Sequence, residues 1–177
     1  MKIFFFRILF LLLLVFLQLS FFNILFPWFH APLFLLGVVA SYALVKNFPE
    51  ALFMTVPLTL LFDAASIGTV SWFSLYAVLF AYVTSFLLRR LLLEHTGIGL
   101  ALYALVAFGA ALAYQALFSF VTHDFSLGET VLLSTSSESL IFSLVLFFPI
   151  FLLMYSSIKQ FEQYLERLNQ KQFRNIR

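Results

Sequence analysis

The chain has 177 residues, of which 63% are hydrophobic and 10% charged, and its formal net charge is +2 with neutral histidines. At a mean hydropathy of +1.05, a soluble domain of this length could not cover its apolar residues with polar surface. Composition therefore excludes a soluble globular protein and predicts an integral membrane protein. The absence of cysteine excludes disulfides and thiol chemistry.

Six apolar segments follow one another along the chain, and about 20 apolar residues suffice to cross a hydrocarbon core. We predict an all-α integral membrane protein in which residues 1–177 form one domain, a single bundle of six transmembrane helices with both termini in the cytoplasm. The predicted spans are residues 3–26, 32–46, 49–64, 70–88, 97–121 and 134–156, followed by a cytoplasmic tail of residues 157–177.

The first span begins with two basic residues, Lys2 and Arg7, and resembles a signal peptide in its charged start and apolar middle. Because no small-residue cleavage site follows, we expect an uncleaved helix with its amino end in the cytoplasm. Gln18, Ser20 and Asn23 interrupt its outer half. Their side chains either face neighbouring helices, where hydrogen-bond partners are available, or are hydrated at the outer interface.

The second and third spans are short, and a tight inner turn that contains Pro49 joins them. Pro57 lies at the middle of the third span, where it removes a backbone hydrogen bond and its ring clashes with the preceding turn. We therefore expect a kink near Phe53. Because the freed backbone groups must be satisfied inside the protein, these short or kinked helices are expected to pack against other helices.

Asp63 ends the third span, and a turn that contains Gly68 separates it from a regular fourth span with Trp72 near its start. A carboxylate at the carboxyl end of a helix faces the negative end of the helix dipole, whereas it would be favoured at the start of the next helix. We predict that Asp63 accepts hydrogen bonds from backbone amides around Ser66 to Thr69 and thereby sets the turn into the fourth span.

The fifth span carries small residues at helical spacing, among them the pairs Ala107/Ala111 and Gly109/Ala113. Such pairs let two helix backbones approach closely. One interpretation is an interface for a partner or a second copy of the chain. The other is packing within the bundle itself.

Gln115 in the fifth span and Glu138 at the polar start of the sixth could form, together with Asp63, an outward-facing polar cavity for a small cationic or polar ligand. The alternative is a structural turn with polar contacts between helices. The serine-rich stretch 134–139 makes the start of the sixth span the least sharply defined boundary. Motifs for nucleophilic, phosphate or metal chemistry are absent from the sequence, so we expect no catalysis, cofactor or metal.

The tail continues the sixth span with Ile158, Phe161, Leu165 and Leu168 on one helical face, which predicts an amphipathic cytoplasmic or interfacial extension. In the six-span arrangement all ten lysines and arginines lie in inner segments and none in outer ones. This distribution satisfies the positive-inside rule, which a five-span arrangement would break.

Two stretches resemble the rod shape-determining protein MreD family of bacterial inner-membrane proteins. They are FLQLSFF in the first span, with a proline after it, and LLFDAASIGTVSWFSLYAVLFAYVTSFLLRR at residues 60–90. In that family a span ends in an aspartate, a short turn with glycine follows, and a long helix ends in basic residues. Overall length and number of spans agree as well, although alanine and threonine stand here where glycine and leucine are common.

The resemblance implies a non-enzymatic component of the machinery for cell shape and lateral wall elongation in the bacterial inner membrane. The expected partners are the lipid bilayer, an MreC-like periplasmic coiled-coil protein and, through it, an MreB-like filament and the peptidoglycan synthases, but no nucleic acid. The alternative is a vitamin-binding S component of an energy-coupling-factor transporter, which is similar to MreD in fold. That family typically has Ala-xxx-Ala in its first span, whereas residues 3–26 contain neither alanine nor glycine.

Overall fold

The computed structural model describes residues 2–25, 32–66, 72–88, 97–122 and 137–174, and within these ranges every regular element is a helix. This agrees with the predicted all-α fold class. The elements are α1 (Lys2–Leu17), the π-helical turn η1 (Gln18–Phe22), α2 (Asn23–Leu25), α3 (Leu33–Val45), α4 (Phe48–Ala65), α5 (Phe73–Val83), the π-helical turn η2 (Thr84–Leu88), α7 (Gly97–Thr122) and α9 (Ser137–Arg174).

Within the described residues, four helical segments are long and apolar enough to cross a membrane: Phe5–Leu25, Phe48–Ala65, Gly99–Leu117 and Leu140–Leu168. Two further apolar helices, Leu33–Val45 and Phe73–Phe86, are shorter. Large apolar side chains cover the outside as well as the core, and Ile24, Leu153 and Phe5 are 78%, 69% and 65% exposed. Such a surface is suited to lipid rather than to water, so the chain is a membrane protein.

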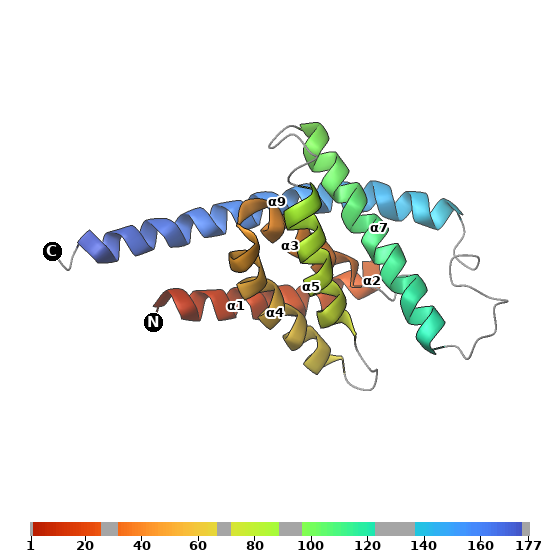
Figure 1. The fold of residues 1–177 in the computed structure, drawn as a ribbon, viewed down its shortest axis with the longest axis horizontal. Helices are drawn as coiled ribbons and strands as arrows, with labels where there is room; N and C mark the ends of the chain where they lie inside the picture. Colours follow the sequence, from red (N-terminus) through yellow and green to blue (C-terminus); the bar gives the residue numbers. More distant parts are fainter. Residues whose placement is uncertain (1, 26–31, 67–71, 89–96, 123–136, 175–177) are drawn as a thin grey trace.

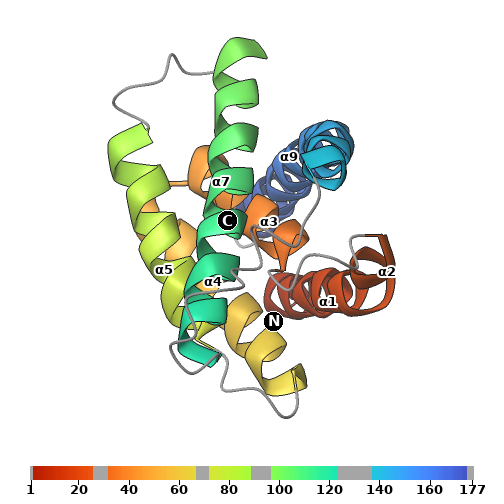
Figure 2. The same cartoon turned by 90° about the vertical axis from the view of Figure 1, so that its right-hand side faces the viewer.

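The short helix α3 is the centre of the fold (Figures 1 and 2). All its side chains from Leu33 to Ala43 are buried, and it contacts α4, α5, α7 and α9. A helix that is apolar on every side must be surrounded by protein or lipid, and here the surroundings are the other helices. Its 13 residues extend over only about 20 Å.

Gly37 sets how closely α3 approaches α9. A Cβ atom at this position would lie 2.5 Å from Met154 Cε and 3.2 Å from Phe147 Cζ. Phe147 and Met154 belong to α9 and are buried. The hydrogen of this glycine therefore leaves the space into which two large side chains of α9 pack.

The helices form two groups that cross one another. In Figure 1, α1 and α9 run in opposite directions, so the start of α1 and the end of α9 lie toward the same side, while α4, α5 and α7 cross them steeply. In Figure 2, α1 and α9 are seen almost end-on and the other three stand upright. The arrangement differs from a simple bundle of six nearly parallel helices.

Contacts between helices define two ends of the molecule. Arg7 of α1 and Lys46, directly after α3, both pair with Glu162 of α9, and we call this the near end. At the far end, Asp63 of α4 contacts the amide of Ser74 in α5. Helix α3 therefore ends where α1 begins, and α4 runs from the near end to the far end.

Two aromatic contacts place α5 and α7 on the same axis between the two ends. The ring of Phe48, where α4 begins, lies 5.3 Å from the ring of Tyr82 late in α5. Phe73, where α5 begins, lies 5.6 Å from Tyr114, which is near the end of α7. Helices α4 and α5 are thus antiparallel, and α7 ends at the far end.

The residues that follow the predicted sixth span continue it as one helix, because α9 extends from Ser137 to Arg174. The apolar face of this extension is covered by the protein: Ile158 and Leu165 are 1% and 3% exposed, and Phe161 stacks on Phe10 of α1 at 4.1 Å. The face that we expected at the cytoplasm or the interface therefore packs within the fold. Residues 134–136, where the sixth span was predicted to start, lie outside the described residues.

Candidate functional site

Asp63 closes the far end of the α4–α5 hairpin. The backbone amide of Ser74 donates a hydrogen bond to Asp63 Oδ2 at 3.0 Å. Trp72 occupies the N-cap position of α5, and its side chain makes no capping hydrogen bond within the described part of the chain. The first amides of a helix have no partner inside the helix, so Asp63 supplies from the previous helix the acceptor that a capping side chain usually provides.

The Ser74 amide was not among the donors predicted for Asp63, and the prediction for the amides of residues 67–69 stays a prediction. We expected amides around Ser66 to Thr69, but the Ser66 amide donates to Phe62 O and completes the last turn of α4. Residues 67–71, which include Gly68, lie outside the described residues. The electrostatic reason for the contact is the predicted one, since a carboxylate is favoured at the amino end of a helix dipole.

An aromatic cluster positions the helix ends around Asp63. The ring of Phe62 lies 5.2 Å from that of Phe73, and Tyr76 lies 5.2 Å from Tyr114. The Tyr76 hydroxyl also donates to Ala110 O in α7 at 2.7 Å. Edge-to-face ring contacts add to the free energy of area burial, so α4, α5 and α7 are held together at the far end.

The other polar candidates occupy different places. Gln115 is buried in α7 directly after Tyr114, and Glu138 lies in the first turn of α9 with its side chain outside the described region. Pro57 is inside α4 on its exposed side, and the Thr59 hydroxyl donates to Thr55 O one turn back. The kink expected near Phe53 and the cavity expected between Asp63, Gln115 and Glu138 stay predictions.

The two pairs of small residues in α7 face in opposite directions. Ala107 and Ala111 are fully buried, whereas Gly109 and Ala113 are exposed. A Cβ atom added at Gly109 would have nothing within 4 Å. The first pair therefore serves packing within the fold, and only the second faces outward.

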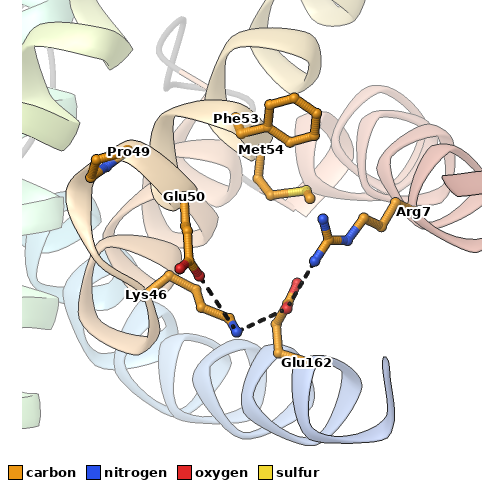
Figure 3. A pocket seen from close by; sticks show the side chains of 7 residues that line it. All are labelled: Arg7, Lys46, Pro49, Glu50, Phe53, Met54 and Glu162. Atoms are coloured by element: carbon orange, nitrogen blue, oxygen red, sulfur yellow. Dashed lines mark hydrogen bonds and ion pairs between the residues drawn. The ribbon is translucent and has the colours of Figure 1, made fainter. Parts of the chain in front are cut away.

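An ion-pair cluster at the near end was not foreseen. It consists of Arg7, Lys46, Glu50, Glu162 and Glu166, which come from α1, the α3–α4 junction, α4 and α9. Figure 3 shows all of these side chains except Glu166. The four ion-pair distances are 3.4 Å for Arg7 Nη2 to Glu162 Oε2, 3.3 Å for Lys46 Nζ to Glu162 Oε2, 2.7 Å for Lys46 Nζ to Glu166 Oε1 and 3.7 Å for Lys46 Nζ to Glu50 Oε2.

Glu162 is the most buried charge in this cluster, with a side chain only 3% exposed. A buried carboxylate is costly to desolvate unless cations pair with it, and Arg7 and Lys46 fulfil this role. Burial tends to lower the pKa of Lys46, but its hydrogen bonds to Glu166 and Glu162 and their charges outweigh burial and raise it above 10.5. The cluster therefore holds Lys46 firmly in its charged form.

A cavity of about 320 Å³ opens beside the cluster. Figure 3 shows the charged side chains pointing toward one another along one side of it, with Phe53 and Met54 on the other. Arg7 Nε and Glu162 Oε1 are buried and make no hydrogen bond to the described residues. The residues that line the cavity are Arg7, Lys46, Pro49, Glu50, Phe53, Met54 and Glu162.

One signal in the sequence points to this cluster. Glu162 shares a helical face with Ile158, Phe161 and Leu165, so an acidic residue interrupts an apolar stripe. A charge on an apolar face requires a partner when that face is buried. The partner could not be identified from sequence, because Arg7 lies 155 positions away along the chain.

Among the described residues, no group of three histidine, aspartate or glutamate side chains is arranged to hold a metal ion. Comparisons of the chain with family models, with curated proteins and with solved structures found no match.

Proposed function

We propose that the protein is a non-enzymatic membrane scaffold of the machinery for bacterial cell shape and lateral wall elongation, similar to MreD. The observation that carries the proposal is the Asp63 hairpin. The stretch of sequence that resembles MreD forms two antiparallel helices, and the aspartate at the end of the first accepts the Ser74 amide at the start of the second. A feature used in the resemblance thereby has a physical role in this chain.

The proposed setting is the bacterial inner membrane, with six spans and both termini in the cytoplasm. Its support is the near end, where Lys46 after α3 pairs with the same Glu162 that pairs with Arg7 at the start of α1. If α1 crosses the membrane, α3 must cross back for its end to lie beside Arg7. The shortness of α3 is acceptable because other helices rather than lipid surround it.

A scaffold of this kind acts by holding partners at fixed positions in the bilayer. The side chains of α3 are buried among the other helices, and the outward-facing side of α7 offers Gly109 and Ala113 for close approach by a helix of an MreC-like partner. The pair of buried alanines on the other side of α7 is already used by the fold and is not available to a partner.

The test is co-purification of the protein with the MreC-like protein of the same cells, combined with measurement of cell width after depletion. We expect association and an increase in width. The Gly109→Leu variant should lose association while its level stays unchanged and its thermal stability does not fall, and Leu79→Phe on the exposed face of α5 is the matched control. Failure to associate, together with unchanged width on depletion, would contradict the proposed function.

A further inference from the structure

We propose that the cavity beside Glu162 binds the headgroup of a phospholipid with a primary amine, of the phosphatidylethanolamine class. This goes beyond the proposed function and does not depend on any protein partner. Three observations support the proposal. They are the position of the cavity near the starts of α1 and α4, the balance of the charges that line it, and the unsatisfied hydrogen-bonding atoms of Arg7 and Glu162.

The cavity lies where headgroups meet the protein. Arg7 is two residues from Phe5, at which the first apolar span begins, and Glu50 belongs to the first turn of α4. Phe53, one turn further along α4, is 63% exposed and also lines the cavity. A lipid with its headgroup beside Glu50 would therefore have its acyl chains alongside exposed apolar side chains of α1 and α4.

The charges that line the cavity balance one another. Arg7 and Lys46 are cationic, and Glu50 and Glu162 are anionic. Glu166 adds a further negative charge at Lys46 but does not line the cavity. An anion alone would meet the carboxylates and a cation alone would meet Arg7, whereas a zwitterion can place each of its charges against the opposite one.

The hydrogen-bonding atoms indicate which zwitterion fits. Arg7 Nε is a buried donor that lacks an acceptor among the described residues, and Glu162 Oε1 is a buried acceptor that lacks a donor there. Phosphate oxygens accept hydrogen bonds from an arginine, and a primary ammonium donates them to a carboxylate.

Phosphatidylcholine provides the sharpest comparison. It has the same phosphate and the same net charge as phosphatidylethanolamine, but its quaternary ammonium has no N–H to donate. The site should therefore distinguish the two lipids through the carboxylates of Glu50 and Glu162, while the phosphate contact with Arg7 is common to both.

The experiment measures lipid bound to the full chain by native mass spectrometry, with equal concentrations of the two lipids carrying identical acyl chains. We expect about tenfold more phosphatidylethanolamine than phosphatidylcholine, the ratio that one charge-assisted hydrogen bond gives. Binding to the wild-type chain should fall stepwise through the N-methyl and N,N-dimethyl lipids, which requires no variant. Equal binding of all four lipids would overturn the proposal.

Two variants locate the site. Glu50→Gln and Glu166→Gln each remove one ion pair to Lys46, but only Glu50 lines the cavity. We expect Glu50→Gln to lower the lipid preference, because one of the two carboxylates that line the cavity is then neutral, and Glu166→Gln to keep it. An equal effect of the two variants would contradict the assignment to this cavity, and competition by free phosphoethanolamine as strong as that by the lipid would contradict a membrane lipid as the occupant.

Discussion

Asp63 acts across a turn rather than along its own helix. At the carboxyl end of α4 its charge faces the negative end of that helix dipole, which is unfavourable, but its contact with the Ser74 amide places it at the positive end of α5. The second effect includes a hydrogen bond and the first does not. Asp63 therefore fixes the position of the start of α5 relative to the end of α4.

Replacement of Asp63 by alanine should lower the free energy of unfolding by about 1 kcal/mol, as loss of a helix-capping acceptor does. Thermal unfolding in detergent, followed by circular dichroism, measures the change. Asp63→Asn is the control because its amide oxygen still accepts a hydrogen bond, and it should retain most of the stability. Equal stability of the wild type and Asp63→Ala would show that the Ser74 contact is not important.

Because of Lys46, the stability of the folded chain should depend on pH in the alkaline range. Because its folded-state pKa is raised above 10.5, the folded chain binds this proton more tightly than the unfolded chain. The stabilisation is therefore complete below pH 10.5 and is lost as the pH rises through the folded-state value.

The expected observation is a difference in melting temperature between the wild type and Lys46→Met that is constant from neutral pH to about pH 10 and then decreases. The comparison with Lys46→Met removes the contribution of tyrosines, which titrate in the same range. A difference that grows above this pH would contradict the role given to the ion pairs of Lys46.

At the scale of elements, glycines on α3 and α7 are in opposite environments. Gly37 of α3 faces Phe147 and Met154 of α9, whereas Gly109 of α7 faces open space. Both glycines are in helix interiors, where glycine is unfavourable relative to other residues. The packing around each glycine therefore decides whether a larger residue there stabilises or destabilises the protein.

Gly37→Leu should destabilise the protein by about 1–3 kcal/mol, because overpacking forces neighbouring side chains to move. Gly109→Leu should be neutral or stabilise by about 0.5–1 kcal/mol through helix propensity. Melting temperatures of the two purified variants give the comparison. A destabilised Gly109→Leu chain would indicate that α7 packs with this face inward.

The positions of the elements could be predicted from hydropathy, and α3 is short as expected. Two expectations were wrong: α4 is long enough to cross a membrane, whereas the fourth span, expected to be regular, is the shorter helix Phe73–Phe86 and ends in the π-helical turn η2. The extension of α9 was less predictable. Its stripe of Ile158, Phe161 and Leu165 indicates one apolar face, but periodicity shows only that a face is apolar and not what covers it. Phe10 of α1 covers part of this face by stacking on Phe161. The contact brings the first and the last helix of the chain together.

At the scale of the whole molecule, the ion-pair cluster and the crossing of the two helix groups could not be predicted. Both depend on contacts between residues far apart in sequence, such as Arg7 and Glu162. Local sequence pattern shows which residues need a partner, such as a carboxylate at the end of a helix. It does not show which partner a buried charge finds, so the cavity beside Glu162 was not foreseen.

The proposed six-span arrangement requires that α3 return the chain to the side of the membrane from which α1 starts. Because the chain has no cysteine, single cysteines can be introduced and labelled in intact cells with a membrane-impermeant maleimide. Asn47 follows α3, Gln163 lies in the extension of α9, and Ala65 ends α4. All three side chains are exposed.

We predict that Ala65→Cys is labelled in intact cells, whereas Asn47→Cys and Gln163→Cys are labelled only after the cells are permeabilised. In an arrangement with four spans, in which α3 and α5 do not cross, Asn47 would lie on the side opposite to Gln163. Labelling of Asn47→Cys in intact cells, with Gln163→Cys protected, would contradict the six-span scaffold.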